Sequence, residues 1–131
     1  MSRFIVKATK TISAAHHLNL PYASKCRNQH GHNYTITVTC SAAEVDSLGM
    51  VVDFTLVKNT FDIFDHQYLN DYLSPEQNPT AEFLAKLVAT RLVSRVPEHW
   101  QTLPNYTPPQ DFRIDSVEVS ETEGNVACYI P

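Results

Sequence analysis

The sequence of 131 residues is poor in cysteine and in positive charge, and it has no long apolar run. Three cysteines are too few, and an odd number, for a disulfide framework, so we expect a reducing cytoplasmic compartment. Ten Lys and Arg against 14 Asp and Glu leave no basic field for nucleic acid. No segment reaches the roughly 20 apolar residues that span a bilayer, and the N-terminus lacks the apolar run of a signal peptide. These absences predict a soluble protein that binds neither membranes nor nucleic acid.

The composition that remains is that of one folded domain over residues 1–131. Apolar residues make up 43% of the chain, charged residues make up 18%, and no repeat or linker divides it. Alternation of apolar and polar residues and runs of β-branched residues predict strands. Apolar residues at helical spacing, which follow Asp53 and Asn78-Pro79-Thr80, predict helices. The expected elements are strands at 3–13, 33–41, 112–121 and 126–130 and helices at 54–64 and from 78–80 to Pro97.

This order predicts an α+β fold with a four-stranded antiparallel sheet and two helices on one face. In the second strand, Tyr34, Ile36, Val38 and Cys40 share one face, and threonines occupy the other. Gly124-Asn125 is expected to form a hairpin turn between the last two strands. The proline-rich stretch 97–111 is expected to be irregular, and Cys40 and Cys128 are expected to be small buried residues.

Histidines suggest a metal site. In His30-Gly31-His32 the two imidazoles point to the same side of an extended backbone, so both can reach one ion. His16, at the end of the first strand, would complete a three-histidine set if the two strands are neighbours. Three neutral nitrogens and an open fourth position are typical of catalytic zinc. A His-x-His pair is also common without a metal, and His17 and His99 are expected to be solvated or packing residues.

Two further groups have alternative interpretations. Cys26, four residues before His30, is either a fourth zinc ligand, making the site structural, or a reactive thiol beside Lys25 and Arg27. Asp65-His66 is either a proton-transfer pair or a solvated helix end.

Together these segments resemble one family, the 6-pyruvoyltetrahydropterin and 6-carboxytetrahydropterin synthases. The resemblance is carried, in order along the chain, by Ser-Ala-Ala-His (13–16), Lys-Cys-x-x-x-His-Gly-His-Asn-Tyr (25–34), Gly-Met-Val-Val-Asp-Phe (49–54), Asp-His-x-x-Leu-Asn (65–70), Asn-Pro-Thr-Ala-Glu (78–82) and Glu-Thr (121–122). It implies the tunnelling fold, in which such sheets assemble into oligomeric barrels, commonly a hexamer made of two trimers.

The resemblance also implies roles for individual residues. His16, His30 and His32 match the zinc ligands, and Cys26 matches the catalytic thiol. Asp65 and His66 match the rest of a catalytic triad that an adjacent subunit supplies. Glu121 matches the carboxylate that anchors the pterin, a role that suits two parallel hydrogen bonds to ring donors. Val117 and Val119 share its strand face, which would place Glu121 at the mouth of an apolar pocket; Glu123 is the less favoured neighbour.

Thr80 and Glu82 match positions near the pterin, although both also suit a helix N-terminus. The implied substrate is 7,8-dihydroneopterin triphosphate, and Lys25 and Arg27 are candidates to meet its phosphates. The three-residue spacer between Cys26 and His30 resembles the carboxy enzymes of queuosine-type deazapurine synthesis, which release acetaldehyde and triphosphate. The alternative reaction is that of a pyruvoyl enzyme, which eliminates triphosphate and keeps the side chain. The alternative from another functional class is a non-catalytic structural zinc-binding domain.

Overall fold

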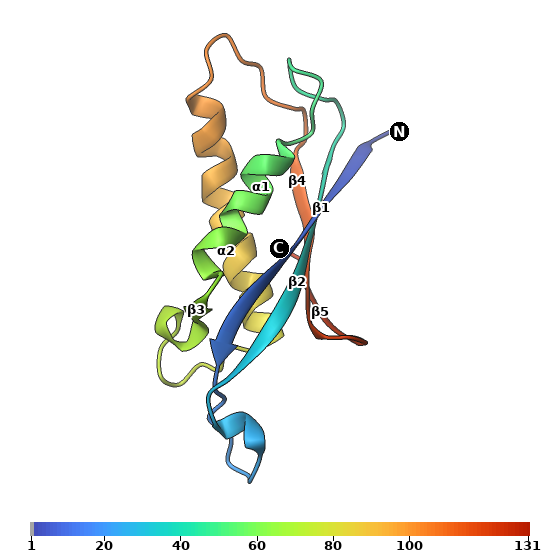
Figure 1. Cartoon of the computed structure of the whole chain (residues 1–131). Coiled ribbons are helices and arrows are strands. Elements are labelled where there is room, and N and C mark those ends of the chain that lie inside the picture. The colour runs from blue at the N-terminus through green and yellow to red at the C-terminus, as the bar shows by residue number, and fades with distance from the viewer. Residues whose placement is uncertain (1) are drawn as a thin grey trace.

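The computed structural model describes residues 2–131 and consists of one twisted sheet with two α-helices packed on one of its faces (Figure 1). The sheet order is β3-β1-β2-β4-β5. The elements are β1 (Phe4–His16), β2 (His30–Ala42), α1 (Phe54–Phe61), β3 (Gln67–Tyr68), α2 (Ala81–Gln101), β4 (Arg113–Thr122) and β5 (Asn125–Tyr129), with short 3-10 helices η1 (Lys25–Arg27), η2 (Asp62–Phe64) and η3 (Leu69–Tyr72).

The predicted α+β fold is confirmed, but the expected strand count of four is wrong. A fifth strand, β3, pairs in parallel with Ala14 and Ala15 at the edge of β1. It is only two residues long, so it has no room for the alternation by which a strand is recognised in a sequence. Among the described residues, no helix is long and apolar enough to cross a membrane.

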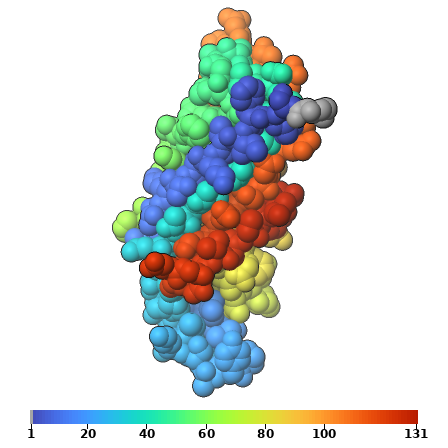
Figure 2. All heavy atoms as spheres, turned by 90° about the vertical axis from the view of Figure 1, so that its right-hand side faces the viewer, coloured from blue at the N-terminus to red at the C-terminus, as the bar shows by residue number. Residues whose placement is uncertain are grey.

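β1 and β2 form the longest ladder, an antiparallel pair that runs without a break from Phe4↔Ala42 to His16↔His30. The expected alternation of β2 is present, because Tyr34, Ile36, Val38 and Cys40 are all buried under the helices. The other face is polar, with hydroxyl contacts between threonines of the two strands, 3.0 and 3.1 Å long. On that side the strands themselves form the molecular surface (Figure 2). This ladder fixes which side chains meet at its ends.

Both helices begin where their capping residues predict. The Asp53 carboxylate accepts hydrogen bonds from the backbone N–H groups of residues 55 and 56, and the Thr80 hydroxyl accepts one from Phe83. The helix expected at 54–64 is α-helical to Phe61 and then tightens into η2. The first turn of α2 therefore begins directly after the Asn78-Pro79-Thr80 segment in the chain.

The expectation that the second helix stops at Pro97 is wrong, since α2 continues to Gln101. A proline within a helix removes one N–H donor, and this loss is tolerated where packing holds the turn. Val96 is fully buried, and the Trp100 ring packs edge-on against Phe112 with centroids 5.2 Å apart. Only residues 102–112 form the irregular connection that the prolines predicted.

The irregular connection is tied to the loop that follows β2 through a buried carboxylate, Asp46. Its side chain accepts hydrogen bonds from the Tyr106 hydroxyl at 2.6 Å and from the backbone N–H groups of Leu48 and Met50. Burial by itself would raise the pKa of Asp46, but these hydrogen bonds outweigh it and lower that pKa. The network fastens the two loops at the end of the molecule away from the histidines.

Candidate metal centre and adjoining cavities

Four side chains converge at the end of the β1–β2 ladder: His16, His30, His32 and Glu121. One potential ligand atom from each lies within 4.8 Å of all the others. The register explains the convergence of the imidazoles, because His16 faces His30 across the ladder and Ala14 faces His32. The Nε2 atoms of His16 and His30 are 3.0 Å apart. The cluster can hold a metal ion, and the sequence had suggested its three histidines.

Two backbone carbonyls orient the rings of this cluster. The Pro79 carbonyl lies 2.7 Å from Nδ1 of His16, and the Asn28 carbonyl lies 2.7 Å from Nδ1 of His30. A carbonyl can only accept, so each Nδ1 donates and each Nε2 turns its lone pair toward the cluster. Burial lowers the pKa of His16, despite the opposing effects of the Pro79 carbonyl and Glu121. The result favours neutral imidazole, the form that binds metal.

Tyr34 also contacts the histidine cluster, although the sequence pattern placed it only on the apolar face of β2. Its side chain is fully buried, and its hydroxyl lies 3.2 Å from Nδ1 of His16. Its ring stands edge-on to His16 and His32, with centroid separations of 6.0 and 5.6 Å. Burial, assisted by the charge of Glu121, raises the pKa of Tyr34, so the phenol stays protonated. The only signal in the sequence is its position two residues after His32 on the same strand face.

Glu121 reaches the histidines from a β-bulge. Ser120 pairs with Val126 and Thr122 pairs with Asn125, so Glu121 is the extra residue of β4. A bulge of this kind redirects a side chain. Its Oε1 atom lies 2.7 Å from Nε2 of His32 and 3.7 Å from Nε2 of His16. The sequence suggested Glu121 as a substrate anchor, but not its proximity to the imidazoles.

The donor set fits a metal ion. Although Nε2 of His32 is close to the Glu121 carboxylate, the geometry is not that of a hydrogen bond, and this buried nitrogen has no hydrogen-bond partner within residues 2–131. A buried polar atom without a partner is costly. Three imidazole nitrogens with a carboxylate at the fourth corner are ligands that zinc accepts. A metal would therefore satisfy the atom that the protein leaves unpaired.

A cavity of about 330 Å³ adjoins the cluster between the start of α2 and β5. Glu121 lines it together with Glu82, Ala81, Ala127 and Cys128. Thr80 caps α2 at the same end of the helix. Of the predicted substrate residues, Glu121 and Glu82 line this hollow, whereas Thr80 does not line it and precedes its wall residue Ala81 in the chain.

Asp65 and His66 lie elsewhere, beside β3 at the β1 edge of the sheet. Asp65 accepts a 2.8 Å hydrogen bond from the Ser13 backbone N–H, and this bond, with help from His66, lowers the pKa of Asp65. Nδ1 of His66 is 3.1 Å from the same carboxylate. His66 adopts a left-handed backbone (φ 58°), and its side chain is 81% exposed. His66 lines a larger hollow of about 550 Å³, and His32 of the histidine cluster lines the same hollow together with Asn33 and Tyr68.

Cys26 lies in η1, in the loop that extends beyond the sheet, and it is half-buried. The Ser24 hydroxyl caps this turn by accepting from the Cys26 N–H at 3.2 Å. The cluster of potential ligands around His16 does not include Cys26. The geometry thus favours a thiol separate from the metal ligands over a fourth ligand.

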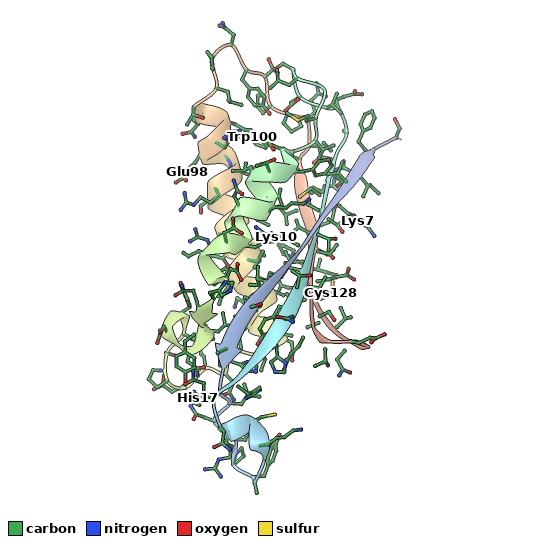
Figure 3. All side chains as sticks on the ribbon, in the orientation of Figure 1. Lys7, Lys10, His17, Glu98, Trp100 and Cys128 are labelled. Carbon is green, nitrogen blue, oxygen red and sulfur yellow. The ribbon has the colours of Figure 1, made fainter. Side chains whose placement is uncertain are left out.

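The remaining residues singled out in the sequence lie outside the cluster. His17, labelled in Figure 3 at the end of β1, stacks on Tyr68 and contacts its hydroxyl. His99 is in the last turn of α2, and Glu123 is exposed in the hairpin turn. Cys40 is buried as expected. The expectation for Cys128 is wrong: it is exposed, because it alternates with Ala127 and Tyr129, which pack on the core, and so lies on the face of β5 away from the helices.

The chain is similar to known proteins over nearly its whole length. The family described as 6-pyruvoyl tetrahydropterin synthase matches residues 5–131. The chain is 37% identical to the 6-carboxy-5,6,7,8-tetrahydropterin synthase of Rickettsia bellii, in a match that covers 96% of this chain and 99% of the relative. It is 36% identical to the enzyme of the same name from Bacillus subtilis, over 59% of this chain and 57% of that relative.

Among solved structures, the chain is similar to the 6-pyruvoyl tetrahydropterin synthase of Caenorhabditis elegans. The TM-score is 0.72 at 26% identity, and the match covers 100% of this chain and 97% of the other. The family match extends over nearly the whole chain, and it includes every residue of the histidine cluster. The chain therefore belongs to the 6-pyruvoyl tetrahydropterin synthase family, and it is a lyase of the tetrahydropterin synthase type.

Proposed function

We propose that the protein converts 7,8-dihydroneopterin triphosphate to 6-carboxy-5,6,7,8-tetrahydropterin, with release of acetaldehyde and triphosphate, in queuosine-type deazapurine synthesis. The observation that carries the proposal is the cluster of His16, His30, His32 and Glu121 beside a cavity of pterin-compatible chemistry. The names of the relatives from Rickettsia bellii and Bacillus subtilis favour the carboxy reaction. We take the protein to act in the cytoplasm.

Zinc is the metal that we assign to His16, His30 and His32. When bound, it would supply Lewis-acid polarisation of the hydroxyl or carbonyl oxygens on the substrate side chain. The protein's own part is to keep the three imidazoles neutral and oriented, through the Pro79 and Asn28 carbonyls and the buried Tyr34 hydroxyl.

Glu121 anchors the pterin in this proposal. A carboxylate can accept two parallel hydrogen bonds from the exocyclic amino group and the adjacent ring N–H, which fixes the ring in one orientation. Glu121 suits this role because it stands both in the cluster and on the wall of the cavity. Thr80 and Glu82, at the start of α2, would contact the same ring system, and Lys25 and Arg27 would face the triphosphate.

Cys26 acts as the base that removes a proton from the substrate side chain. Asp65 and His66 transfer protons on the opposite side of the substrate. Asp65 is suited to orient His66, because their contact is 3.1 Å and the Ser13 N–H keeps Asp65 ionised. His66 directly precedes β3 at one edge of the sheet, whereas Glu121 is in β4. The strands β1 and β2 lie between β3 and β4. We therefore assign Asp65 and His66 to the site of a neighbouring subunit, in a hexamer made of two trimers.

The product assay tests the reaction. Purified zinc-loaded protein is incubated with 7,8-dihydroneopterin triphosphate, and acetaldehyde and triphosphate are measured together. Equal amounts of both are expected. Triphosphate without acetaldehyde would refute the carboxy reaction and favour the pyruvoyl reaction of the family.

A non-catalytic zinc domain is the second candidate, because four potential ligands, Glu121 among them, can saturate the ion. Thiol modification separates the two candidates. If alkylation of Cys26 in a Cys128→Ser variant, which lacks the exposed thiol at the cavity, leaves zinc bound and abolishes turnover, the catalytic proposal is supported. If no turnover occurs with any dihydropterin triphosphate before alkylation, the structural alternative replaces it.

A further inference from the structure

The segment His17–Asn19 links the last metal-cluster residue of β1 to the loop that contains Cys26. It lies at the end of the sheet where that loop extends away from the body of the molecule (Figure 1). Within the described part of the chain, no strand pairs with it. Its position therefore depends on whatever bonds its backbone groups make.

Two asparagines take the place of a neighbouring strand. Asn70 accepts from the His17 backbone N–H at 2.9 Å and donates to the His17 carbonyl at 3.1 Å. Asn78 does the same at Asn19, accepting from its N–H at 2.7 Å and donating to its carbonyl at 3.2 Å. A primary amide can form both bonds of such a ring because it has an acceptor and a donor side by side. We call Asn70 and Asn78 the asparagine pair.

Leu18 lies between the two anchored residues, His17 and Asn19, and its backbone N–H points to the opposite edge of the segment. In an extended segment, the backbone groups of successive residues point to opposite edges. The Leu18 N–H accordingly donates to the Cys26 carbonyl at 2.8 Å. The Cys26 N–H is in turn bonded to the Ser24 hydroxyl. The backbone of Cys26 is thus held through Leu18 by the segment that the asparagine pair anchors.

We propose that Asn70 and Asn78 are positioning residues that set Cys26 relative to the histidine cluster. The inference rests on the proposed function, in which Cys26 is the base. Neither asparagine is among the potential metal ligands. Asn78 also adjoins Pro79, whose carbonyl orients His16, whereas Asn70 has no such contact with the cluster. Asn70 is therefore the residue whose replacement isolates the effect on Cys26.

The experiment compares Asn70→Ala with Asn59→Ala, a control at an exposed asparagine of α1. Four quantities are measured on the zinc-loaded protein: kcat, KM, the zinc dissociation constant, and amide hydrogen exchange at Leu18 and in the β1–β2 ladder. In Asn70→Ala we expect Leu18 exchange to accelerate at least about tenfold while the ladder is unchanged. We expect kcat to fall about 10- to 100-fold with a smaller change in KM.

Zinc affinity in Asn70→Ala should change by less than the roughly tenfold loss that follows removal of a partner of a metal ligand. Asn70→Asp is a second variant that keeps the acceptor for the His17 N–H, while it replaces the donor to the His17 carbonyl by a charged carboxylate oxygen. It should fold like the parent protein and show a smaller loss of kcat than Asn70→Ala.

Three outcomes would overturn the inference. Unchanged kcat in Asn70→Ala, with Leu18 exchange accelerated, would show that Cys26 needs no such positioning. Equal losses of zinc affinity, ladder protection and kcat would show a role in general stability alone. An Asn59→Ala variant with the same loss of kcat would show that the effect is not specific. Failure of the proposed function itself is separate, because it would appear as full activity of Cys26→Ser in an otherwise unaltered chain.

Discussion

Replacement of Glu121 by glutamine distinguishes a substrate anchor from a metal ligand. The two roles compete in this structure, since the carboxylate is 2.7 Å from Nε2 of His32 and also lines the adjoining cavity. Glutamine has the same shape but carries no charge, and it presents an N–H where the pterin also presents a donor. One charge-assisted hydrogen bond is lost, a cost of about 1.5 to 3 kcal/mol. At 1.4 kcal/mol per factor of ten, this corresponds to about 10- to 150-fold in kcat/KM.

Zinc affinity decides between the roles. If His16, His30 and His32 hold the ion and Glu121 holds the pterin, the variant should bind zinc nearly as well as the parent protein in a competition titration with a chromophoric chelator. The steady-state assay should show the loss in kcat/KM. If the variant lost zinc affinity by as large a factor as it lost kcat/KM, the anchor assignment would be refuted.

Three further predictions concern single residues. Cys26→Ser should lower turnover by about 10²- to 10⁴-fold and leave zinc affinity unchanged, because Cys26 is outside the cluster; isothermal titration that showed weakened zinc binding would contradict this. Thr80→Ala removes the N-cap of α2 and should lower the free energy of unfolding by about 1 kcal/mol in urea, whereas Thr80→Ser should cost less. Asp46 has a lowered pKa in the folded state, so its stabilisation is complete above its unfolded pKa of about 3.9 and is lost as the pH falls through the folded pKa. Asp46→Asn should flatten that acid-side slope in unfolding titrations, and an unaltered slope would show that another group causes it.

The sequence predicted most of the fold because its strong patterns are local. The alternation of β2, the caps Asp53 and Thr80, and the hairpin at Gly124 each depend on neighbours in the chain. Two features were missed because they depend on tertiary packing. The β3 strand exists only as a partner for β1, and α2 continues through Pro97 because Val96 and Trp100 are packed.

The candidate site was predictable in its histidines but not in their surroundings. His30 and His32 share a face by strand periodicity, and pairing of β1 with β2 brings in His16. The approach of Glu121 depends on a bulge in β4, and the orientation of His16 depends on the carbonyl of Pro79, far away in the chain. Neither a bulge nor a backbone carbonyl has a signature in side-chain identity, so both became visible only in three dimensions.

The β1–β2 register has a consequence for how the protein folds. Side chains alternate between faces, so a slip of the ladder by a single residue would turn His30 and His32 away from His16. The same slip would bring the threonines to the helix side and expose Tyr34, Ile36, Val38 and Cys40, so burial of the apolar face already specifies the register. A metal that binds only aligned strands would add about 4 kcal/mol to the correct one at a thousandfold excess over its dissociation constant. Metal binding would then add to the burial of the apolar face in favouring the one strand alignment that also brings the three imidazoles together.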